Sequence, residues 1–197
     1  MGFAAEISSI LDINGNVSKI LTSEYIQSIE PYIQQYPPKF LSKDQELQIR
    51  RSAELVVKQI ESLAPQSLTD QDILIDLGWI LAMAYNLDIL STEDFPREYF
   101  QRALTINKEN RRGNYLMGMF LASTHKYHWE SIPYLEKALQ LGEEDARYTL
   151  GLLFVQKGKN KEGIDYLKTY SKKYPDNEHV KNVIKTIEEG KLQFKAN

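Results

Sequence analysis

Two similar stretches of sequence follow one another between residues 110 and 177, and each has the pattern of a helical hairpin. The first contains Met117-Gly118-Met119-Phe120-Leu121, and the second contains Leu150-Gly151-Leu152-Leu153-Phe154. The two glycines lie 33 residues apart, at positions 118 and 151. A hairpin of this length cannot bury its apolar face alone, so neighbouring copies must stack on one another. This pattern therefore predicts an all-α protein built from stacked helical hairpins.

Helical spacing of apolar residues extends over most of the chain. In the repeats it predicts helices at about 111–124, 130–141, 145–156 and 161–173, preceded by helices at about 70–86 and 96–106. Nearer the N-terminus it predicts a helix at about 3–11, a second from about residue 17 in a segment that ends at Pro37-Pro38, and a third at about 42–64 with Leu47 facing inward. Pro31 should break or kink the second of these at Glu30, because proline removes a helical hydrogen bond.

The ends of the chain differ from the repeats in pattern. Residues 1–66 form an N-terminal helical segment, either a cap or degenerate repeats, and residues 67–176 contain three hairpins. Residues 177–197 contain a last helix at about 177–194, which is apolar on one side and charged on the other. Helical repeat proteins need such a half-polar terminal element to stay soluble, so we expect this helix to be a cap.

The three hairpins share short motifs at matching positions. These are Leu77-Gly78-x2-Leu81, Met117-Gly118-x2-Leu121 and Leu150-Gly151-x2-Phe154 in the first helices, Ser131-x3-Leu135 and Gly163-x3-Leu167 in the second helices, and Pro175 after the last hairpin. With these motifs, residues 71–177 resemble the tetratricopeptide repeat family, and residues 139–146 are also similar to Sel1-like repeats. The resemblance implies a right-handed α-solenoid with extra N-terminal helices and a C-terminal capping helix. The repeat glycines are expected where the two helices of a hairpin cross closely.

In the family that the motifs resemble, the first helix of each repeat lines a concave groove. The corresponding residues here are Asp72, Ile75, Asp76, Trp79 and Met83 in the first hairpin, Arg112, Tyr115, Met119, Ala122 and Ser123 in the second, and Asp145, Tyr148, Leu152 and Gln156 in the third. Trp79, Tyr115 and Tyr148 would form a ladder of aromatic side chains, which often dominate binding. The alternative is that these rings pack between repeats or under the N-terminal helices.

A groove of this kind favours a protein–protein interaction adaptor or scaffold that binds a peptide or helix of a partner. One alternative is self-assembly, in which exposed ends of the solenoid stack into a homodimer. Another is an enzyme whose site lies between the N-terminal helices and the repeats. The sequence contains no phosphate-binding loop, nucleophile elbow or zinc-protease motif, so we expect no catalytic activity and no cofactor.

Charge and composition weigh against other classes of ligand. The net charge is −3 and acidic residues alternate with the lysines between 157 and 173, so we expect no nucleic-acid binding. His125 and His128 share a turn without an evident third ligand, which favours surface residues over a metal site. The chain has no cysteine and no run of 18 apolar residues, so we expect no membrane insertion. These features suggest a cytoplasmic protein, or a periplasmic or secreted one if a signal peptide has been removed.

Overall fold

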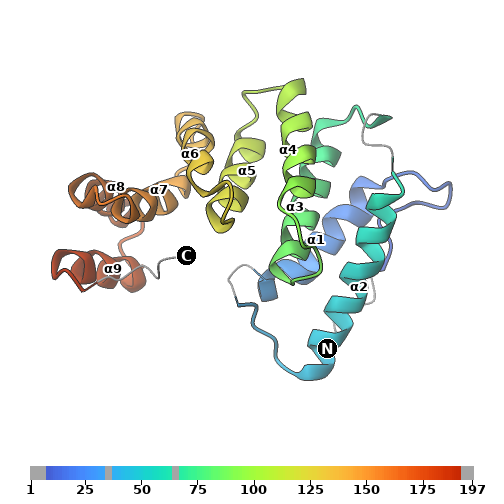
Figure 1. The fold of residues 1–197 in the computed structure, drawn as a ribbon, viewed down its shortest axis with the longest axis horizontal. Helices are drawn as coiled ribbons and strands as arrows, with labels where there is room; N and C mark the ends of the chain where they lie inside the picture. The colour runs from blue at the N-terminus through green and yellow to red at the C-terminus, as the bar shows by residue number, and fades with distance from the viewer. Residues whose placement is uncertain (1–7, 34–36, 64–66, 192–197) are drawn as a thin grey trace. The chain divides into compact units, whose positions relative to one another are not determined.

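The computed structural model describes residues 8–33, 37–63 and 67–191, and within these ranges the chain is helical without any named strand (Figure 1). The helices are α1 (Lys19–Ile33), α2 (Lys43–Glu61), α3 (Gln71–Asn86), α4 (Asp94–Ile106), α5 (Arg111–Ser123), the short 3-10 helix η3 (His128–Glu130), α6 (Ser131–Gln140), α7 (Ala146–Gln156), α8 (Asn160–Lys173) and α9 (Glu178–Glu188). The all-α class predicted from the sequence is confirmed.

The chain divides into two compact units. Helices α1 to α4 belong to the first unit, residues 1–108, and helices α5 to α9 belong to the second, residues 109–197. The first predicted hairpin, α3 with α4, is thus grouped with the N-terminal helices. The three-part division at residues 66 and 176 follows the repeat pattern and stays a prediction.

In the first unit, helix α3 is the central element, and α1, α2 and α4 all contact it. Its residues from Leu77 to Ala84 are all apolar, and nine residues of the helix are buried, among them Leu74, Leu77 and Leu81. A helix that is hydrophobic all round is stable only when other elements cover it. The three surrounding helices meet that requirement.

Side chains that satisfy free backbone groups fix where α2 and α3 begin. The Ser42 hydroxyl accepts a hydrogen bond from the Gln45 amide at 3.1 Å, as expected for a capping box. The side-chain oxygen of Gln45 accepts a hydrogen bond from the Leu41 amide at 2.8 Å. In the usual capping box the donor is one residue later, at the capping residue itself, which is Ser42 here. Asp70 caps α3 by accepting from the amides of Asp72 and Ile73, which otherwise lack partners in the first turn.

The predicted helix at 3–11 is wrong over its described part. Residues 8–18 instead form a turn closed by an isolated β-bridge between Leu11 and Val17, and residues before 8 lie outside the described part of the chain. The Asp12 carboxylate accepts from the amides of Asn14 and Asn16, which favours a turn over a helix. The side-chain oxygen of Gln59 in α2 accepts a hydrogen bond from the Ile10 amide at 3.0 Å, which holds this segment against the helix.

Two further expectations in the first unit are corrected. Helix α1 continues through Pro31 to Ile33, so the alternative of a break at Glu30 is wrong, while a kink there stays a prediction. Ile29 and Ile33 are both buried on either side of the proline, and their packing compensates for one lost hydrogen bond near the helix end. Leu47 was expected to face inward, but its side chain is 53 % exposed.

Each hairpin brings its two helices close together at the repeat glycine. A Cβ atom added at Gly118 would lie 2.6 Å from Cγ of Leu135, and one added at Gly151 would lie 2.6 Å from Cγ of Leu167. At Gly78 the nearest atoms belong to the Phe100 ring, at 3.1 Å. The predicted close crossings are therefore confirmed, and Phe100 takes in α4 the place that the leucines take in the other hairpins.

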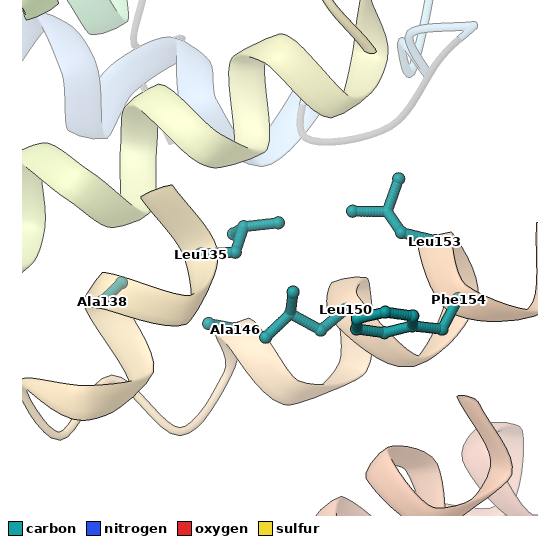
Figure 2. Close-up of a cluster of buried hydrophobic side chains, with 6 residues drawn as sticks. All are labelled: Leu135, Ala138, Ala146, Leu150, Leu153 and Phe154. Atoms are coloured by element: carbon teal, nitrogen blue, oxygen red, sulfur yellow. The ribbon is translucent and has the colours of Figure 1, made fainter. Parts of the chain in front are cut away.

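Two buried clusters hold helices α6 to α9 of the second unit together. The first cluster joins α6 and α7 and contains Leu135, Ala138, Ala146, Leu150, Leu153 and Phe154, which Figure 2 shows as sticks. The second cluster joins α7, α8 and α9 and contains Val155, Leu167, Val180, Ile184 and Ile187. Helix α9 thus buries its apolar side on the last hairpin and leaves its charged side in water.

Shortening the chain after Asp176 should therefore expose an apolar surface on α7 and α8. We expect the shortened protein to aggregate or to lose solubility, because Val155 and Leu167 would lose their α9 partners. Light scattering at increasing protein concentration would measure this. A chain that ends at Lys191 is the matched control and should remain like the full-length protein. A monomeric and equally stable short form would show that α9 is dispensable.

Candidate functional site

In the first unit, helix α1 lies against the face of α3 that was expected to line a groove. The indole nitrogen of Trp79 donates a hydrogen bond to the Glu30 carboxylate of α1 at 3.0 Å. At the other end of the same face, Lys19 of α1 lies 3.6 Å from the Asp72 carboxylate. This face of α3 is therefore covered by α1 of the same chain. That agrees with the alternative expectation, in which Trp79 packs under an N-terminal helix.

The remaining predicted groove residues of α3 have little free surface. Met83 is 1 % exposed and Ile75 is fully buried, so both belong to the core. Asp76 is half-buried. The expectation that Met83 and Ile75 line an open groove is therefore wrong, because α3 is covered more completely than an outer repeat helix would be.

In the second unit the predicted residues remain partly exposed on neighbouring helices. Tyr115 and Met119 of α5 are half-buried against the cluster between α6 and α7, and Leu152 of α7 is half-buried against the cluster under α9. Helices α5 and α7 are in contact, and the Thr149 hydroxyl donates to the Met119 sulfur at 3.2 Å. The first helices of two successive hairpins therefore present apolar side chains side by side.

Helix α9 extends this row by one more helix. The Tyr148 hydroxyl of α7 lies 3.0 Å from Nε2 of His179 on α9. We call the row the α5–α7–α9 strip, and its residues are Tyr115, Met119, Tyr148, Leu152 and His179. Because each of these side chains is half-buried or exposed, the strip offers contact area at its surface while its inner side packs on the core.

The other predicted groove residues of the second unit take different roles. Gln156 is half-buried, and its side-chain oxygen lies 2.8 Å from Nε2 of His128. Nδ1 of His128 lies 2.6 Å from the carbonyl oxygen of Ala122, so this histidine connects the end of α5 to the end of α7. It is therefore a structural residue, not the plain surface residue that was expected. Ser123 and Arg112 are exposed, and the Ser123 hydroxyl donates to the Phe120 carbonyl.

Three tyrosines gather at one end of the strip, where α7, α8 and α9 meet. The ring centroids of Tyr148 and Tyr170 are 5.7 Å apart and those of Tyr170 and Tyr174 are 4.6 Å apart, in both cases with tilted planes. All three rings are half-buried. We call Tyr148, Tyr170 and Tyr174 the tyrosine cluster. Sequence reasoning identified Tyr148 but missed Tyr170 in α8 and Tyr174, the residue that follows α8.

Asp145, the residue before α7, supplies the charge at this cluster. Hydrogen bonding to its carboxylate is the main cause of the raised pKa of Tyr174, and the nearby charges of Glu143 and Glu144 act in the same direction. The pKa of Tyr170 is also raised, chiefly by burial and then by the charge of Asp145. Asp145 itself is exposed. The cluster therefore combines aromatic faces with negative potential.

Other classes of site find no matching arrangement in the described part of the chain. No group of three or more His, Asp or Glu residues there could hold a metal ion. None of the helices in that part is long and apolar enough to cross a membrane. Among the lysines between 157 and 173, Lys159 pairs with Glu162 at 3.2 Å and Lys168 with Glu188 at 2.7 Å, as is typical of a solvated helical surface.

The repeat motifs coincide with close helix crossings at Gly78, Gly118 and Gly151, one in each of the three hairpins. A scan against protein-family models finds no match, and comparisons with curated proteins and with solved structures also find none.

Proposed function

We propose that this protein is an interaction module that binds a peptide or helix of a partner protein on the α5–α7–α9 strip. The observation that carries the proposal is the row of half-exposed Tyr115, Met119, Tyr148 and Leu152 on helices that contact one another. Aromatic and sulfur-containing side chains of this kind are enriched at interfaces, where they supply large contact area. Their inner sides are fixed by packing, so little conformational entropy is lost when a partner binds.

The proposal includes a small α-solenoid of tetratricopeptide-like or Sel1-like repeats. Three hairpins with a close glycine crossing at the same place support it, as does the contact between the first helices of the last two hairpins. In such a solenoid the first helices form the inner surface, and an extended or helical peptide lies across them. The coverage of α3 by α1 restricts the proposed binding surface to the second unit.

The test uses peptides selected from a random displayed library on the full-length protein. Changing Tyr115 and Leu152 together to alanine should lower the affinity for the selected peptides at least tenfold. Two anchors are lost, each of which contributes about 1 kcal/mol or more to binding. Isothermal titration would give the affinities, and urea unfolding would confirm that each variant is folded under the conditions of binding.

A matched pair on the outer side of α8 is the control. Lys161 and Thr169 are both exposed, and changing them together to alanine should leave the affinity within about twofold of wild type. The proposal fails if the library yields no binder. It also fails if the binders are indifferent to the change at Tyr115 and Leu152.

A further inference from the structure

We infer that the tyrosine cluster and Asp145 form a receptor for a basic side chain, arginine or lysine, of the bound partner. This inference rests on the proposed function and specifies what one end of the strip recognises. It starts from the arrangement of the three rings, whose centroids are 5.7 and 4.6 Å apart with planes inclined by 46° and 44°. Rings inclined in this way are not stacked face to face, and all three are only half-buried.

The faces of aromatic rings attract cations because the ring quadrupole is negative on the face. Asp145 strengthens this preference, since its carboxylate raises the pKa of both Tyr170 and Tyr174 by stabilising their neutral hydroxyl forms. No lysine or arginine of the described residues forms an ion pair with Asp145. The exposed carboxylate is therefore accessible to an external cation.

The neighbouring acids behave differently, which singles out Asp145. Glu143 lies 3.6 Å from Nε of Arg111, and Glu144 lies 2.6 Å from Nε of Arg147. Each of these two acids therefore has a cationic partner within the chain. A guanidinium or ammonium group that reached the cluster would contact the faces of the tyrosine rings. It would also pair with Asp145, the one acid of this turn that forms no ion pair with another described residue.

The chain already places one cation at the edge of the cluster. Nζ of Lys173 lies 5.7 Å from the ring centroid of Tyr174, at the outer limit of a cation–π contact. Lys173 is exposed and lies in the last turn of α8. An external basic side chain would compete with it for this ring, so removing the lysine charge should strengthen binding.

Small blocked amino acids are suitable probes, because the natural partner segment is not needed. The experiment records aromatic NMR spectra of the full-length protein with labelled tyrosine during titration with N-acetyl-arginine amide, N-acetyl-lysine amide and the neutral N-acetyl-citrulline amide. We expect saturable shifts of Tyr170 and Tyr174 with the two cations, with dissociation constants of about 1–30 mM. Citrulline has nearly the shape of arginine without its charge and should give no saturable shift.

Two variants and one control decide the origin of the shifts. Asp145→Asn should lower the affinity for the cationic probes at least fivefold. Asp165→Asn on the outer side of α8 removes the same charge and should change that affinity little. Lys173→Gln should raise the affinity about twofold or more. A cluster that only holds α9 in place would show neither effect, and equal shifts with citrulline or an unchanged affinity in Asp145→Asn would overturn the inference.

The displayed library separates this inference from the proposed function. Enriched basic residues in the selected peptides, with binding that is lost in Asp145→Asn, would agree with both. Selected peptides that depend on Tyr115 and Leu152 but contain no basic residue, and that bind Asp145→Asn normally, would leave the interaction module intact and overturn the basic-side-chain receptor alone.

Discussion

Changing Gly151 to leucine should lower the free energy of unfolding of the second unit by about 1–3 kcal/mol. The first atom of the new side chain would already lie 2.6 Å from Cγ of Leu167 and 3.0 Å from the carbonyl oxygen of Gly163. The remaining three carbons of the leucine have no space in the crossing, so α7 and α8 must separate. This loss should exceed the gain of up to about 1 kcal/mol that leucine brings over glycine through helix propensity.

Urea unfolding followed by tryptophan emission would measure the loss. The chain has two tryptophans, so in a Trp79→Phe background Trp129 reports on the second unit alone. Lys161→Leu is the matched control, because it places the same side chain at an exposed position of α8 and should change stability by less than about 0.5 kcal/mol. An unchanged unfolding midpoint for Gly151→Leu would mean that the two helices do not cross closely at this glycine.

Changing Phe100 to alanine should destabilise the first unit by about 3–5 kcal/mol. The ring is fully buried, and it is the side chain that approaches Gly78 of α3 most closely. Because glycine has no side chain to fill the space, the cavity would remain between α3 and α4 or draw the two helices together. A loss of this size approaches the total stability of many small domains.

The readout is the emission of Trp79 in a Trp129→Phe background. Phe100→Leu is the graded control and should cost less than half as much, since most of the buried volume is retained. If Phe100→Ala unfolded at nearly the same urea concentration as the wild type, the ring would not be the counterpart of Leu135 and Leu167 in the other hairpins.

The repeated part of the chain was predictable because its signals are local. Apolar spacing predicted α5 to α8 to within one or two residues at each end, and the glycine motifs located the crossings with Leu135 and Leu167. The last helix was predicted too long, because α9 ends at Glu188 and not near residue 194, which lies outside the described residues. Phe100 was missed because it lies 22 residues after Gly78, whereas Leu135 and Leu167 follow their glycines by 17 and 16 residues. The hydrogen bonds of Asp12 likewise replaced an expected helix by a turn, which apolar spacing alone does not reveal.

The site was less predictable, since it depends on contacts between distant segments. Nothing in the sequence around Trp79 indicates that α1 supplies Glu30 to its indole nitrogen. The tyrosine cluster joins α7 to the end of α8, and only the spacing of Tyr170 and Tyr174 is visible in the sequence. The residues that were identified correctly as partly exposed, such as Tyr115 and Tyr148, follow from their position relative to the repeat glycines.

The last hairpin has glycine on both sides of its crossing, and this limits how its sequence can change over time. A Cβ atom at Gly163 would lie 2.5 Å from the carbonyl oxygen of Gly151, which is a backbone atom. A larger residue at 163 therefore cannot be accommodated by choosing a smaller one at 151, because no smaller one exists. In sequences that descend from this chain, the two glycines should be retained together. A larger residue at Gly118, by contrast, can be accommodated by a smaller one at Leu135, so these two positions should vary together.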